Sequence, residues 1–92
     1  MKSAYELAME RLAKQSPTVK LTDAQKKQIA EIDSTYRAKI AEREIFLQGE
    51  LARAAEKGDA EAFAQLERQL ASERRRLEEE GEERKERVRK AA

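Results

Sequence analysis

Carboxylates are the side chains in this sequence that are numerous enough to suggest acid–base chemistry. The 92 residues include 19 Asp and Glu but no His and no Cys. The Glu-x-x-His pattern of carboxylate-bridged metal sites is therefore impossible, and imidazole bases and thiol nucleophiles are missing. The three glycines, at positions 49, 58 and 81, are too far apart for a phosphate-binding loop. A narrow helical rod also offers no pocket that could shift the pKa of a general acid. We expect no enzymatic activity, no catalytic residue, no cofactor and no metal site.

Basic side chains suggest a different chemistry, the binding of nucleic acid or another polyanion. Residues 1–28 carry six basic and three acidic side chains, residues 84–92 carry five and one, and the body between them carries nine and fifteen. If the two ends meet, they form a region of net charge +7 beside a body of −6. The candidate contacts are Lys26, Lys27, Arg84, Lys85, Arg87, Arg89 and Lys90. Because no aromatic residue lies among them for base stacking, polyanion binding is the alternative and not the leading hypothesis.

The elements that must position these side chains are long helices. Charged residues make up 42% of the chain and aromatic residues 4%, which leaves too little apolar material for a thick core. A chain dominated by Ala, Glu, Arg, Lys and Leu is typical of coiled-coil helices, and 92 residues form at most one small domain. Disorder would be the competing interpretation, but disorder predicts no sustained periodicity.

The first predicted helix is short and amphipathic, over residues 3–14. It begins with the letters SAYE, in which Ser3 and Glu6 form a capping box. The apolar side chains that share its face are Tyr5, Ala8, Met9 and Leu12. Pro17, the only proline, predicts a break, so residues 15–21 are expected to be a linker.

Two long helices are predicted after the linker, over residues 22–57 and 59–90. Thr22 and Gln25 form a second capping box at the start of the first of them. Gly58 suits the left-handed conformation that ends many helices, and Asp59 is a good N-cap for the helix that follows. The sequence therefore predicts a tight turn at Gly58 and an antiparallel helical hairpin.

Two stripes with the same spacing predict the register of this hairpin. Their steps of three, four and four residues give an eleven-residue repeat, which favours nearly straight packing. Facing residues should have numbers that add up to 117, so the midpoint falls between Gly58 and Asp59. The first stripe is Ile29, Ile32, Tyr36, Ile40, Arg43, Leu47, Leu51 and Ala54, and the second is Phe63, Leu66, Leu70, Arg74, Leu77, Gly81, Lys85 and Val88.

Two layers of the predicted hairpin are distinctive. Tyr36 should face Gly81, so a bulky ring meets a residue without a side chain; the alternative is that Gly81 is a tolerated surface glycine. The second layer should be a crossed network of Arg43, Glu44, Glu73 and Arg74. This network would fix the register of the helices. Alternatively, both arginines extend into solvent and contribute little to the stability of the hairpin.

The far side of helix 22–57 carries a second set of apolar and small residues. These are Ser34, Ala38, Ala41, Ile45 and Ala52, with Phe46 on the flank. Either the first helix folds back onto this face, or a second copy packs there and gives a four-helix bundle with two-fold symmetry. Alternatively, the alanines serve only helix propensity and Ile45 is a lone exposed apolar residue. We expect a homodimer, and the chain could also bind an unidentified protein partner.

A short motif adds a resemblance to a known family. The letters LTDAQ, residues 21–25, are similar to the LTxxQ signature of the Spy- and CpxP-type periplasmic chaperones, which are helical hairpins. The resemblance covers five residues, and the second LTxxQ copy of that family does not occur in this sequence. It implies a hairpin that holds client proteins.

Taken together, these patterns favour a non-enzymatic protein-interaction or structural module, such as a scaffold or adaptor. Polyanion binding through the basic end is the alternative, and a client-holding chaperone is a third hypothesis. No window is long and apolar enough to span a membrane, and the N-terminus has no apolar signal-peptide core. We therefore expect a cytoplasmic protein without membrane contacts; a periplasmic location would require that a leader has been trimmed from the chain.

Overall fold

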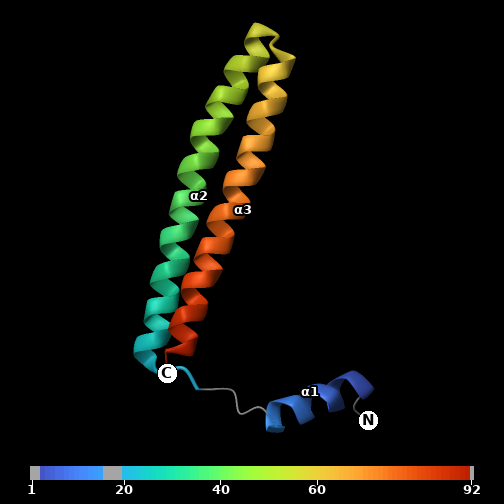
Figure 1. The fold of residues 1–92 in the computed structure, drawn as a ribbon, viewed down its shortest axis with the longest axis vertical. Helices are drawn as coiled ribbons and strands as arrows, with labels where there is room; N and C mark the ends of the chain where they lie inside the picture. The colour runs from blue at the N-terminus through green and yellow to red at the C-terminus, as the bar shows by residue number, and fades with distance from the viewer. Residues whose placement is uncertain (1–2, 16–19, 92) are drawn as a thin grey trace.

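The protein is an all-α helical hairpin with a short additional helix. The computed structural model describes residues 3–15 and 20–91, and Figure 1 shows the arrangement of its elements. The described residues form three helices and no strand: α1 (Ala4–Gln15), α2 (Asp23–Lys57) and α3 (Ala60–Lys90). α2 and α3 lie side by side along their length, and the molecule measures 59 × 35 × 17 Å. The predicted all-α hairpin is confirmed.

Side-chain caps begin both long helices. At the start of α2 the Gln25 backbone N–H donates to Thr22 Oγ1 at 3.1 Å, and the Thr22 backbone N–H donates to Gln25 Oε1 at 2.8 Å. At the start of α3 the Ala62 backbone N–H donates to Asp59 Oδ1 at 3.0 Å. These bonds satisfy backbone donors that have no partner within the helix, which fixes where each helix begins.

The turn between the long helices is built on Gly58. Its φ of 68° is left-handed, and its backbone N–H donates to the Ala55 carbonyl at 3.1 Å. The Asp59 backbone N–H donates to the Ala54 carbonyl at 2.9 Å. This pair of bonds is a Schellman motif, which closes α2 and turns the chain directly into the cap of α3.

The core is one line of side chains between α2 and α3. Its buried members are Tyr36, Leu47, Ala54, Leu77 and Gly81, and Leu47 is only 1% exposed. The other apolar members of the two stripes are half-buried. So thin a core agrees with the composition, because two helices in contact bury one stripe each.

α1 does not pack against either long helix in the part of the chain that the structure describes. It lies beyond the open end of the hairpin, away from the turn (Figure 1). The Glu6 backbone N–H donates to Ser3 Oγ at 3.2 Å, as expected of its cap. Tyr5, Leu7 and Met9 are exposed. Pro17, on which the predicted break rests, and the side chain of Leu12 lie outside the described residues.

No helix in the described ranges combines the length and the apolar character that a membrane crossing requires.

Candidate functional site

The layer of Arg43 and Arg74 joins the two helices through crossed ion pairs. Arg43 donates to Glu73 through Nε at 2.9 Å and through a terminal nitrogen at 3.0 Å. On the other side of the seam, Arg74 Nε lies 3.0 Å from Glu44 Oε1. Each arginine therefore reaches the glutamate next to its facing arginine, and the two positive charges are kept apart. A two-pronged Arg–carboxylate contact is directional, so it favours one register of the hairpin.

These contacts change the acidity of the groups involved. Hydrogen bonding from Arg43 lowers the pKa of Glu73, with a smaller contribution from the Gln69 amide. The same contact raises the pKa of Arg43. The Arg43–Glu73 pair is therefore stable wherever Glu73 is ionised, and protonation of Glu73 in acid weakens it.

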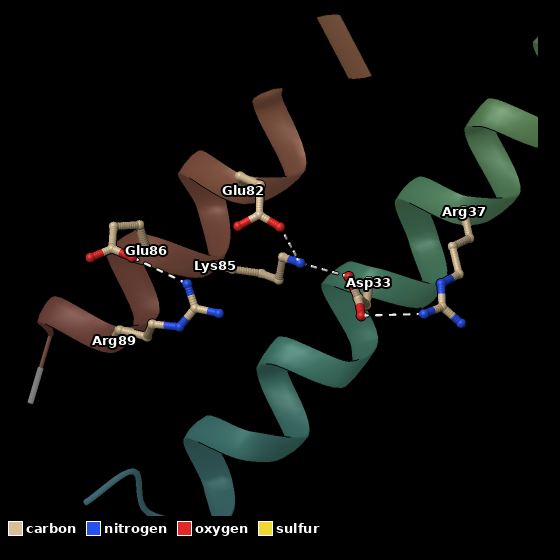
Figure 2. A network of polar contacts seen from close by, with 6 residues as sticks. All are labelled: Asp33, Arg37, Glu82, Lys85, Glu86 and Arg89. Carbon is tan, nitrogen blue, oxygen red and sulfur yellow. Dashed lines mark hydrogen bonds and ion pairs between the residues drawn. The ribbon is translucent and has the colours of Figure 1, made fainter. Parts of the chain in front are cut away.

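A second ion cluster lies near the open end and centres on Lys85 (Figure 2). Lys85 Nζ is 2.8 Å from Asp33 Oδ1 on α2 and 2.7 Å from Glu82 Oε1 on its own helix. Arg37 approaches the other oxygen of Asp33 at 3.8 Å. The Lys85 side chain is only 13% exposed. Hydrogen bonds with Asp33 and Glu82 raise the pKa of Lys85, and the bond from Lys85 lowers the pKa of Asp33.

This cluster changes the role expected of Lys85. The sequence placed Lys85 both in the inner stripe and among the polyanion contacts. In the structure its side chain lies between α2 and α3 and pairs with Asp33. Asp33 was missed because it lies one position off the stripe of α2. Its signal was available, since a lysine in an apolar stripe needs an acidic partner on the facing helix.

Several other basic residues of the open end are also engaged within the chain. Arg87 lies 3.1 Å from Glu83, and Arg89 lies 3.1 Å from Glu86. The Arg84 guanidinium lies over the Tyr36 ring, 5.7 Å from its centroid. Lys26, Lys27 and Lys90 are exposed. Much of the positive charge counted from the sequence is therefore compensated locally, which weakens the case for a polyanion site.

Tyr36 is the bulkiest part of the core, and its ring rests on Gly81. A Cβ placed on Gly81 would lie 3.1 Å from Tyr36 Cγ, closer than ordinary van der Waals contact. Gly81 is buried, so it is not a surface glycine. Lys39 Nζ lies 4.9 Å from the centroid of the ring. In the described part of the chain the buried Tyr36 hydroxyl has no hydrogen-bond partner.

The outer face of α2, defined as Ser34, Ala38, Ala41, Ile45 and Ala52 with Phe46 on its flank, is exposed. Ile45 is 72% exposed and Phe46 is 54% exposed, although they are neighbours in the middle of the longest helix. The Arg43 guanidinium lies 5.1 Å from the centroid of the Phe46 ring and partly covers that ring. Nothing in the described hairpin covers Ile45.

Concave sites are shallow. Two open grooves of about 370 and 380 Å³ flank Tyr36, and a third of about 450 Å³ lies at the turn beside Phe63. Among the described residues, no group of acidic side chains has the arrangement of a metal site.

Comparisons with protein families, with curated proteins and with solved structures find no match for this chain.

Proposed function

We propose that this chain is a non-enzymatic helical hairpin that acts as a protein-interaction or structural module and associates with itself through the outer face of α2. The observation that carries this proposal is the exposure of Ile45 and Phe46 side by side. The exposure of large apolar side chains to water is unfavourable, and patches of them commonly mark sites of protein contact.

The hairpin suits a role as a rod or spacer. Its helices are long, and their register is held by the Gly58 turn and by ion pairs at two levels. The eleven-residue spacing of the stripes supports nearly straight helices, so that the outer face runs along one side of the rod. A straight exposed stripe is the shape that another helix can follow over several turns.

The direct test replaces Ile45 with a charged residue. Ile45→Asp should convert a dimer into a monomer, because burying an unpaired carboxylate between two helices is strongly unfavourable. Light scattering measures the molar mass, and circular dichroism should show that most of the helix content is retained.

Gln65→Asp is the matched control, because it adds the same charge at an exposed position of α3. It should leave the mass unchanged. If Ile45→Asp and the unmodified chain have the same mass, the outer face is not an interface between copies and the proposal fails.

A further inference from the structure

The open end of the hairpin is the part where packing holds the two helices least. Among the residues that the structure describes, none is buried before Tyr36 on α2 and none is buried after Gly81 on α3. The apolar side chains Ile29, Ile32 and Val88 are only half-buried there. A segment with so few buried contacts opens locally at a low cost in free energy, so a single hydrogen bond matters more in it.

The Gln25 side chain makes two hydrogen bonds at this end, one at the start of its own helix and one to the other helix. Its Oε1 accepts from the Thr22 backbone N–H at 2.8 Å, which is one half of the capping box of α2. Its Nε2 donates to the Val88 carbonyl of α3 at 3.1 Å. A carboxamide can do both, because it carries an acceptor oxygen and a donor nitrogen side by side.

The two backbone groups that Gln25 contacts are of the kind that helix ends leave without a partner. Thr22 is the N-cap of α2, and Val88 lies in the last turn of α3, where carbonyls have no N–H four residues further along the helix. The other bond that the described structure gives the Val88 carbonyl comes from the Ala91 backbone N–H, at 3.3 Å. The Gln25 amide therefore caps the start of α2 and the end of α3 at once.

We infer that Gln25 is a latch that makes the first turn of α2 and the last turn of α3 open and close together. When α2 frays, Gln25 leaves with its helix and the Val88 carbonyl loses a donor. When α3 frays, the Gln25 amide loses an acceptor that holds it in its capping position. In the described hairpin the next hydrogen bond between the helices, from Lys85 to Asp33, lies about two turns away. The latch acts within one chain and does not depend on the proposed self-association.

The substitution Gln25→Glu separates the two bonds. At neutral pH a carboxylate still accepts from the Thr22 N–H, and Glu suits this position of a capping box, but it has no proton to donate to the Val88 carbonyl. Hydrogen exchange of the full chain, followed by NMR residue by residue, measures the effect on the end of α3. The amides of residues 88–91 should exchange about 2- to 13-fold faster, the factor expected for the loss of one hydrogen bond.

Gln28→Glu is the matched control, because it adds the same charge one turn further along α2, at an exposed position. A negative charge is unfavourable near the C-terminal end of a helix, and this control measures that effect without removing the bond to Val88. Exchange at the end of α3 should be slower in Gln28→Glu than in Gln25→Glu. If the two variants exchange equally fast, the Gln25–Val88 bond does not hold the end of α3 and the latch is overturned.

Thr22→Ala tests the coupling of the two helix ends. It removes the hydroxyl that accepts from the Gln25 backbone N–H at 3.1 Å, so the first turn of α2 should fray more. In the otherwise unmodified chain this fraying should also speed up exchange at the end of α3. In a chain that carries Gln25→Glu it should not, because the link between the helices is already broken. The same effect of Thr22→Ala on α3 in both chains, or no effect in either, would overturn the latch.

Discussion

The two faces of α2 differ in the contacts that their side chains make within the chain. On the inner face Tyr36 meets Gly81 and Arg43 meets Glu73, while Leu47 is fully enclosed. On the outer face Ile45 is 72% exposed, and a Cβ placed on Gly49, on the same side of the helix, would meet nothing within 4 Å in the described structure. Both faces lie on one continuous helix, so helix propensity cannot be the cause of the difference. The contacts of the inner face are made within one chain, and the proposed self-association would use the outer face.

The largest expected effect on stability is that of truncating an apolar residue of the inner face, compared with one of the outer face. Leu47→Ala should destabilise the hairpin by about 2–5 kcal/mol, because it removes a fully buried side chain and leaves a cavity. This loss should not depend on protein concentration. Ile45→Ala should cost little in dilute solution and more as the concentration rises, because it acts through the dimer.

Urea unfolding at two protein concentrations, followed by circular dichroism, checks this comparison. If both variants lose the same free energy of unfolding at both concentrations, Ile45 takes no part in contacts between chains.

The second comparison uses two glycines on the two long helices. Gly81→Ala should lower stability, because overpacking against Tyr36 costs about 1–3 kcal/mol and the gain in helix propensity is only about 1 kcal/mol. A Cβ at position 49 would lie in open space. Gly49→Ala should therefore raise the stability of the single hairpin by about 1 kcal/mol, because alanine has the higher helix propensity. The two variants should therefore shift the melting temperature in opposite directions.

Gly49→Leu extends this comparison to the dimer. Its side chain fits the free hairpin but crowds the close approach of a second helix, so it should weaken association without loss of helix content. Light scattering and circular dichroism on the same samples separate these effects. Dimers that are as tight with leucine as with glycine would show that Gly49 lies outside the interface.

The smallest effect concerns the ion pairs of the inner face. Hydrogen bonds from Lys85 and Arg43 lower the pKa values of Asp33 and Glu73 in the folded chain. Their stabilising contribution is complete above the unfolded-state values of about 4 and is lost as the pH falls through the folded values. The pKa of Lys85 is raised, so its contribution is complete below about pH 10.4 and is lost as the pH rises further.

Thermal melts across the pH range test this assignment. The double variant Asp33→Asn, Glu73→Gln should flatten the acid side of the stability profile, and Glu79→Gln, at an exposed position of α3, should not. An unchanged acid side in the double variant would mean that these pairs contribute nothing to folding.

The sequence predicts most of the inner face because its signals are local or repeated. The Gly58 turn and its flanking caps are short motifs, and the turn sets which residues face each other, including Tyr36 and Gly81. The Asp33–Lys85 contact was missed because it depends on a long side chain that reaches across from the stripe. The sequence therefore placed Lys85 in the inner stripe but also counted it among the candidate polyanion contacts.

Two features could not be predicted from the sequence for a physical reason. The placement of α1 depends on a linker whose composition imposes no geometry, and the expected alternatives were a place on its own hairpin or on another chain. Among the residues that the structure describes, α1 does not pack against its own hairpin. Whether another molecule covers the outer face cannot be read from one chain, since such contacts would be made by that molecule.

The molar mass of the unmodified chain in solution tests the central claim most directly, namely that α2 carries a second interface. Each chain has a mass of 10.6 kDa. Light scattering over a range of concentrations should give a mass that approaches twice this value, and Ile45→Asp should stay at the single-chain mass throughout. A single-chain mass for the unmodified protein at every concentration would contradict the account.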